Sequence, residues 1–269
     1  MQNPLTDYLH FTKQLATDVV SEMRNAETDL TIEKKGRGDW FSALDLQLER
    51  LMRQRILRAF PTHGFLGEED GGATASDWLW IVDPIDGSMN FLRGLPHYSV
   101  SIALAFKGEP VVACVADPVR QEFFTAARGM GAKLNDRPIK ASSVEHLADA
   151  VVATVFPKPE ALEMSSYAYR LERVLGAVAG ARRAGSMALD LAYLAAGRVD
   201  AFWAQNMGPW DAAAGVLLIR EAGGEIFTLD GLPWLESRHI AASTMTLSFA
   251  WRDLLEKTKH PSNNAAAWL

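Results

Sequence analysis

Two carboxylates follow an apolar run in the stretch WIVDPIDGSMNF, which covers residues 80–91. Asp83 and Asp86 lie at the end of a predicted strand, and ligands of α/β sheets bind beyond the carboxyl ends of strands. Pro84 restricts φ between them and so limits their relative placement. Gly87 and Ser88 follow with backbone amides and a hydroxyl, at a predicted helix start that favours an anion.

Carboxylates beside an anion site repel one another and the anion. Two unit charges about 4 Å apart cost on the order of 4 kcal/mol at an effective dielectric near 20. A hard cation offsets this repulsion, and ligands that are all oxygen favour magnesium over zinc. Because Asp-Pro and Asp-Gly are common turn formers, the letters DPIDG taken alone are also typical of a simple turn.

Further acidic residues occur in two other segments. Glu68 and Glu69 follow an apolar stretch in GFLGEED, and Asp211 lies at a predicted helix start in GPWDAAAG. Taken separately, the glutamates are typical of a solvated loop, and Asp211 is typical of a first-turn acid that interacts with the helix dipole. Together with the strand-end aspartates, they predict a metal site if the fold brings them to one place.

The totals limit the class of protein. The 269 residues are 48% hydrophobic and 22% charged, which is typical of a soluble globular chain. The net charge of -6 argues against a nucleic-acid surface as the main function. The single cysteine, Cys114, excludes an intrachain disulfide. Neither an export signal nor an apolar run of about 18 residues occurs, so we expect a cytoplasmic protein without a membrane span.

Apolar periodicity predicts helices interleaved with strands. We expect helices over residues 4–23, 42–60, 160–179, from 186 onward and over 210–222, and strands over 64–66, 78–82, 98–106, 111–116, 122–126, 151–155, 200–203 and 225–227. Residues 34–39 (KKGRGD) are predicted as a polar loop and residues 259–269 as a loose tail. Such alternation indicates a layered α/β architecture.

The chain resembles the inositol monophosphatase family, within the lithium-sensitive, magnesium-dependent phosphatases. The resemblance covers nearly the whole chain and rests on the ordered segments SALDLQLER, GEED, WIVDPIDGSMNF, RRAGSMALDLAYLAAGRVDAFW and PWDAAAGVLLIREAGG. It implies an α/β (mixed α+β) fold that forms a five-layer αβαβα sandwich, assembled as a homodimer. We expect an N-terminal half, 1–140, with most metal ligands and a C-terminal half, 141–269, that completes the site.

The resemblance also implies the metal ligands. A first magnesium ion would be held by Glu68, Asp83 and the backbone carbonyl of Ile85. A second would be held by Asp83, Asp86 and Asp211, and Glu68 would help to place a third. The cofactor is therefore expected to be two or three Mg²⁺ ions per site.

The implied catalytic groups are Glu68, Asp45 and Ser88. Gly87 and Ser88 would receive the substrate phosphate through their backbone amides. Asp45 would accept a hydrogen bond from the Ser88 hydroxyl, and this pair with Glu68 would polarise a metal-activated water that attacks phosphorus in line.

The substrate-contacting turn of the family is matched by Gly185, Ser186 and Met187. Inositol-specific members carry a glutamate seven residues before the W-D aspartate, and this chain has Ala204 there, with Gln205 as a neighbouring acceptor. This difference affects the choice of substrate more than the phosphatase chemistry.

The predicted function is a magnesium-dependent phosphomonoesterase for a small polyol or sugar phosphate that is similar to inositol 1-phosphate. The alternatives within this fold are 3'-phosphoadenosine 5'-phosphate, histidinol phosphate and fructose 1,6-bisphosphate as substrates. Arg183 is a candidate for positive charge near the substrate and is also typical of a surface position. An alternative of another class is a protein that docks a macromolecular partner on the same scaffold.

Overall fold

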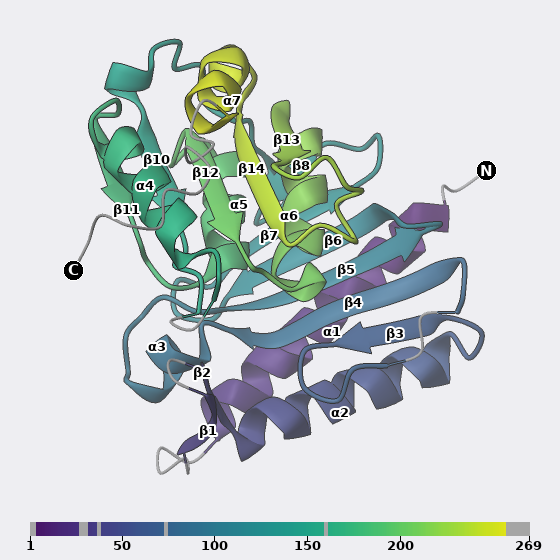
Figure 1. Cartoon of the computed structure of the whole chain (residues 1–269). Coiled ribbons are helices and arrows are strands. Elements are labelled where there is room, and N and C mark those ends of the chain that lie inside the picture. Colours follow the sequence, from purple (N-terminus) through teal and green to yellow (C-terminus); the bar gives the residue numbers. More distant parts are fainter. Residues whose placement is uncertain (1–3, 27–31, 37–38, 73–74, 159–160, 257–269) are drawn as a thin grey trace.

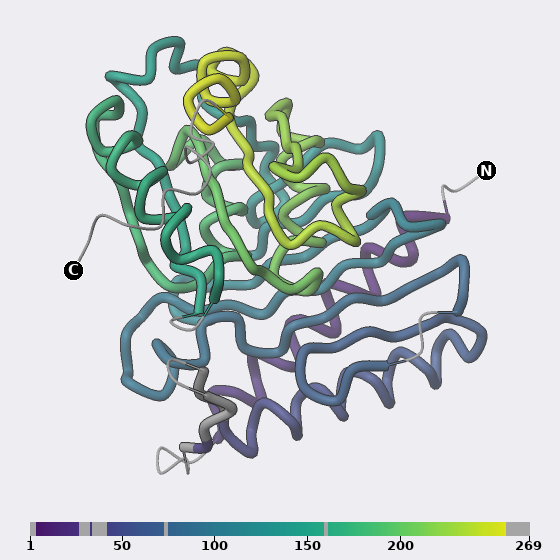
Figure 2. The backbone as a smooth tube through the Cα atoms, viewed as in Figure 1, coloured from purple at the N-terminus to yellow at the C-terminus, as the bar shows by residue number. Residues whose placement is uncertain are grey.

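Two β-sheets with helices on their faces form the fold, as Figure 1 shows. The structure is a computed structural model that describes residues 4–26, 32–36, 39–72, 75–158 and 161–256 (Figure 2). The predicted tail at residues 259–269 lies outside the described residues. None of the described helices is both long and apolar enough to cross a bilayer.

A seven-stranded sheet runs in the order β3-β4-β5-β6-β7-β8-β9. Its strands are β3 (Gly64–Gly67), β4 (Trp78–Asp86), β5 (Ser99–Phe106), β6 (Glu109–Asp117), β7 (Glu122–Ala127), β8 (Ala132–Leu134) and β9 (Arg137–Pro138). Successive side chains of a strand face opposite sides. In β4, Leu79 and Ile81 therefore enter the core on one face. Trp80 and Val82 enter the core on the other face. Since β3 and β4 are parallel, both end at the same edge.

A five-stranded sheet runs in the order β11-β10-β12-β14-β13. Its strands are β10 (Val151–Thr154), β11 (Gly180–Arg182), β12 (Ala201–Gln205), β13 (Gly224–Thr228) and β14 (His239–Thr244). β10 is parallel to both β11 and β12, and β14 is antiparallel to β12. The carboxyl ends of β10, β11 and β12 therefore lie at the edge where β14 begins.

Helices separate and cover the two sheets, and three buried clusters join the layers. α1 (Pro4–Asn25) and α2 (Ala43–Ala59) pack on the outer face of the seven-stranded sheet. α5 (Met187–Ala195) and α6 (Pro209–Glu221) lie between the sheets. α4 (Met164–Leu175) and α7 (Ser248–Glu256) cover the far face of the five-stranded sheet. The predicted five-layer αβαβα sandwich is confirmed, and the short α3 (Ser88–Leu92) follows β4.

The loop predicted over residues 34–39 is wrong at residues 34–36 and 39, which belong to strands, and its residues 37 and 38 lie outside the described residues. β1 (Ile32–Gly36) and β2 (Asp39–Ser42) pair as an antiparallel hairpin, with Gly36 opposite Asp39. The sequence suggested a loop because these residues are polar and do not alternate with apolar ones. A short hairpin outside the two main sheets does not need that alternation.

Other departures concern elements whose pairing depends on distant segments. The helix predicted over 160–179 covers only Met164–Leu175, and β11, which follows at residues 180–182, was not predicted. β8, β9, β14 and α7 were not predicted. β14 has the alanine-containing sequence HIAAST, and it is a strand because it pairs with both β12 and β13. The division into halves 1–140 and 141–269 stays a prediction.

Candidate functional site

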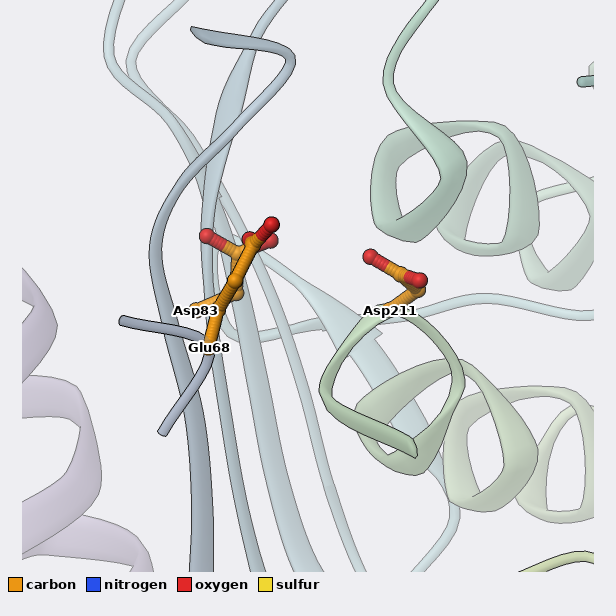
Figure 3. Close-up of side chains that lie close together, drawn as sticks. All are labelled: Glu68, Asp83 and Asp211. Atoms are coloured by element: carbon orange, nitrogen blue, oxygen red, sulfur yellow. The ribbon is translucent and has the colours of Figure 1, made fainter. Parts of the chain in front are cut away.

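Three carboxylates from separate elements meet at the ends of β3 and β4. Glu68 directly follows β3, and Asp83 lies in β4, so the parallel pairing of these strands brings both to one edge. Asp211 lies in the first turn of α6, on the other side of the site. Figure 3 shows Asp211 extending from its helix toward the other two side chains. One oxygen of each carboxylate lies within 4.8 Å of the others.

The electrostatics of these groups indicate a cation. Burial raises the pKa of Asp83 well above its ordinary value, and the charges of Glu68, Asp86 and Asp211 raise it further. Burial and then the charge of Asp86 raise the pKa of Asp211 to about 7, while the Gly208 N–H opposes the shift. Asp83 Oδ2 is buried and has no hydrogen-bond partner among the described residues. A buried, unpartnered carboxylate oxygen within an acidic cluster fits a hard cation such as magnesium.

Asp86 borders the same cavity but its carboxylate is held by the start of α5. It accepts hydrogen bonds from Met187 N at 3.1 Å, Ala188 N at 2.8 Å and Ser99 Oγ at 3.2 Å. The Ser186 hydroxyl also donates to it. Burial raises the pKa of Asp86, and these hydrogen bonds oppose the rise. The cluster of three oxygens does not include Asp86, so its role as a metal ligand stays a prediction.

The Ser88 hydroxyl lies within hydrogen-bond distance of Asp45. Ser88 Oγ is 2.8 Å from Asp45 Oδ1 and also 2.8 Å from the carbonyl oxygen of Ile85, and its one hydrogen can serve only one of them at a time. Asp45 Oδ2 accepts hydrogen bonds from the backbone N–H and the hydroxyl of Ser42, so its side chain is held at the start of α2. Asp45 is buried rather than an exposed first-turn acid.

Two glycine turns, at Gly87 and Gly185, border the cavity. Gly87 has a φ of 93° and Gly185 has a φ of 99°, values that residues with a side chain rarely adopt. A Cβ on Gly87 would lie 3.0 Å from the carbonyl oxygen of Gly185, so the turns touch. Asn90 joins them, because its Nδ2 donates to the carbonyl oxygens of His97 at 2.6 Å and Ala184 at 2.8 Å.

These groups border an open cavity with a volume of about 160 Å³. Its lining contains most of the predicted site residues and Arg183, the candidate for positive charge near the substrate, together with Met89 and Asn90, which were not assigned to the site from the sequence. The lining residues are Glu68, Asp83, Ile85, Asp86, Gly87, Ser88, Met89, Asn90, Arg183, Gly185 and Asp211.

Three predicted substrate contacts lie behind the cavity wall. Ser186 is fully buried and donates to Asp86, and Met187 packs into the core between the sheets. Gln205 is buried, with its Nε2 donating to Ser166 Oγ at 3.1 Å. Ala204 is also packed between the sheets. Direct contact of these side chains with a substrate stays a prediction.

Glu49 is a positioning residue that was not identified from the sequence. This buried α2 side chain accepts hydrogen bonds from Glu69 N at 2.7 Å and Asp70 N at 2.8 Å, and so holds the loop that carries Glu68. The spacing in the sequence could have identified Glu49. Positions 45, 49, 52 and 56 share one helix face, and an acid among buried apolar residues needs a hydrogen-bond partner.

Comparisons with known proteins give one family. The model of the "Inositol monophosphatase family" matches residues 5–264. The chain is 43% identical over 249 residues to "Inositol-1-monophosphatase" of Rhizobium meliloti (strain 1021), with 91% of each chain covered. It is 42% identical over 220 residues to "Nus factor SuhB" of Pseudomonas aeruginosa, covering 79% of this chain and 81% of that protein. The crystal structure of extragenic suppressor protein suhB from Bartonella henselae matches with a TM-score of 0.87 and 36% identity, over 93% of this chain and 99% of that one.

Proposed function

The chain belongs to the inositol monophosphatase family, and from this premise we propose that it is a magnesium-dependent phosphomonoesterase for a small polyol or sugar phosphate. The observation that carries the proposal is the convergence of Glu68, Asp83 and Asp211, whose oxygens lie within 4.8 Å of one another around a cavity of about 160 Å³. A bound cation would offset the repulsion within this cluster, where burial and the neighbouring carboxylates raise the pKa of Asp83.

The metal would be held by these three carboxylates, with the Ile85 carbonyl and Asp86 as further proposed ligands. When bound, magnesium supplies positive charge that acidifies water and offsets the charge developing on the phosphoryl oxygens. Gly87 and Ser88 border the cavity and would orient the phosphate through their amides.

Ser88, Asp45 and Glu68 would handle the proton of the attacking water. When the Ser88 hydroxyl donates to Asp45, a lone pair of its oxygen can accept a hydrogen bond from water in the cavity. Ser42 holds the Asp45 carboxylate in place, so this acceptor for the Ser88 hydroxyl is positioned without the substrate. The Glu68 carboxylate lines the same cavity and is the acceptor that we propose for the water proton.

A panel of phosphate esters assayed with and without magnesium tests this function. The panel contains inositol 1-phosphate, a sugar monophosphate, fructose 1,6-bisphosphate, histidinol phosphate and 3'-phosphoadenosine 5'-phosphate. We expect phosphate release with at least one small polyol or sugar ester, loss of the rate on chelation and its return with added Mg²⁺. A rate that is unaffected by chelation, or no hydrolysis of any ester by folded protein, would contradict the proposal.

A macromolecular docking role is the second candidate. It is supported by the relatives that carry the name "Nus factor SuhB", such as the one from Pseudomonas aeruginosa at 42% identity. A pull-down with the wild-type chain and a variant that lacks the acidic cluster, each with and without magnesium, tests it. Capture of the same partner in all four conditions would support docking that is independent of catalysis.

We also propose that the protein is a homodimer and that it is cytoplasmic. The family resemblance implies the first, and the sequence pattern indicates the second. Sedimentation of the magnesium-loaded protein measures the assembly state, and cell fractionation measures the location.

A further inference from the structure

The chain after α3 folds back against the turn at Gly87. Leu95 N donates to the carbonyl oxygen of Asn90 at 2.9 Å, and Asn90 Nδ2 donates to the carbonyl oxygen of His97 at 2.6 Å. A Cβ on Gly87 would lie 3.3 Å from that same oxygen of His97, so the two segments are in contact. We call residues 94–98 the return loop. Its backbone supports the turn that would receive the phosphate.

The return loop lies between α3, which ends at Leu92, and β5, which begins at Ser99. Segments outside helices and strands are generally more mobile, so the position of this loop depends on contacts from neighbouring elements. His97 makes one such contact with α5. Its ring centroid lies 5.8 Å from that of Tyr193, and its Nε2 lies 3.5 Å from Asp190 Oδ1. The loop is therefore anchored on one side by α5.

A second anchor comes from the turn between β6 and β7. Arg120 Nη1 donates to the carbonyl oxygen of Pro96, within the return loop, at 3.0 Å. The same nitrogen donates to Asp117 Oδ2 at 3.0 Å, and Asp117 is fully buried. The other oxygen of Asp117 accepts the backbone N–H groups of Val119 and Arg120, each at 2.9 Å. Asp117 and its turn therefore hold Arg120 in the orientation that reaches the return loop.

A displacement of the return loop would alter the phosphate-binding side of the cavity. Movement of His97 would take an acceptor away from Asn90, the side chain that joins the turns at Gly87 and Gly185. A misplacement of about 1 Å in a binding group can cost on the order of 100-fold in rate. The three clustered carboxylates come instead from the ends of β3 and β4 and from the start of α6. The loop should therefore affect the binding of phosphate more than the binding of magnesium.

We propose that Arg120 is a positioning residue for the reacting phosphate, which acts through the Pro96 carbonyl and the return loop on the turn at Gly87. This inference rests on the proposed function of the same site. Arg120 is not one of the residues that line the cavity, so it acts through the backbone of the loop rather than by contact with the phosphate. The β6–β7 turn thus helps to place the amides that bind the phosphate.

Binding of inorganic phosphate to the magnesium-loaded protein tests the proposal. Calorimetry measures the Kd of phosphate for wild type, Arg120→Gln and Arg120→Lys, and hydrolysis of the best ester of the panel gives KM and kcat. A Mg²⁺ titration reports on the acidic cluster, and the Tm shows that each variant is folded, as expected for a side chain that is 43% exposed. Arg198→Gln is the matched control. Its guanidinium is 35% exposed and donates to Glu122 beside the same turn, rather than to the return loop.

We expect Arg120→Gln to raise the Kd of phosphate and the KM about fivefold, as for the loss of one hydrogen bond, with kcat and the Mg²⁺ midpoint within about twofold of wild type. Arg120→Lys, which can still donate to Pro96, should restore most of the affinity, and Arg198→Gln should leave it unchanged. An unchanged Kd in folded Arg120→Gln would show a purely structural residue, and an equal rise in both glutamine variants would show attraction by charge alone; either result overturns the inference. A wild type that neither binds phosphate nor hydrolyses any ester would instead overturn the proposed function, and this inference with it.

Discussion

Replacement of Asp211 by asparagine tests two effects of the acidic cluster separately: its role in turnover and its destabilisation of the folded chain. Asparagine keeps the size of the side chain and an oxygen that can accept the hydrogen bond from Gly208 N, which is 2.7 Å long. It removes one ligand and one of the charges that repel each other around Asp83. We therefore expect Asp211→Asn to abolish turnover while the chain stays folded.

The magnitude follows from the pKa of Asp211, which the fold raises from 3.8 to about 7. The folded carboxyl keeps its proton up to about pH 7, whereas the unfolded chain loses it near 3.8. Stability of the metal-free wild type therefore decreases as pH rises through this window. A difference of about three pKa units corresponds to at most on the order of 4 kcal/mol above pH 7. The asparagine variant has no carboxyl to ionise, so its free energy of unfolding should exceed that of metal-free wild type above pH 7. This difference should decrease to about 2 kcal/mol at pH 5.

Urea denaturation in the presence of a chelator at pH 5 and pH 8 measures these free energies, and phosphate release with Mg²⁺ measures turnover. Asp7→Asn is the matched control, because Asp7 is also a first-turn acid but is exposed on α1. A variant at Asp211 that retains near-normal turnover would refute the metal assignment. A metal-free variant no more stable than wild type at pH 8 would refute the electrostatic reasoning.

Three further substitutions probe the surroundings of the cluster. Ser88→Ala removes the hydrogen bond to Asp45 and should lower kcat about 100-fold, with a stability change of about 1 kcal/mol in urea denaturation, whereas Ser88→Thr should keep most of the rate. Glu49→Ala removes two hydrogen bonds to the loop after β3 and should raise the Mg²⁺ concentration for half-maximal rate at least about tenfold in a metal titration. Gly87→Ala forces a side chain into φ of 93° and toward the carbonyl oxygen of Gly185, so stability should fall by about 1–3 kcal/mol and KM should rise.

Much of the site could be predicted from the sequence because its residues lie in short, unusual segments. Asp83 and Asp86 come after a strongly apolar run within β4, and Asp211 stands at a recognisable helix start, so local patterns locate each one. Their convergence depends on the parallel pairing of β3 with β4 and on the packing of α6 between the sheets, neither of which a local pattern contains. The resemblance to a family supplied that information.

The parts that were missed depend on registers between distant strands. Lys158 and Arg238 are near one edge of the five-stranded sheet because β10 and β12 end there and β14 begins there, yet these two residues are 80 positions apart and have no common motif. Asp86 looked like a free ligand in the sequence, and only the position of α5 shows that four groups of the protein donate hydrogen bonds to it.

The acids of the site also have structural roles, and this explains how the chain can fold before it binds metal. Asp45 accepts the backbone N–H at the start of α2, Asp211 accepts the one before α6, and Asp86 accepts two at the start of α5. Each helix start offers positive charge to a carboxylate, which reduces the repulsion that the cluster would otherwise suffer. Among the described residues, Asp83 accepts a hydrogen bond from the Ile85 N–H on one oxygen, and its other oxygen is buried without a partner. A bound cation would therefore stabilise Asp83 more than the acids around it, because those acids already accept hydrogen bonds from helix starts.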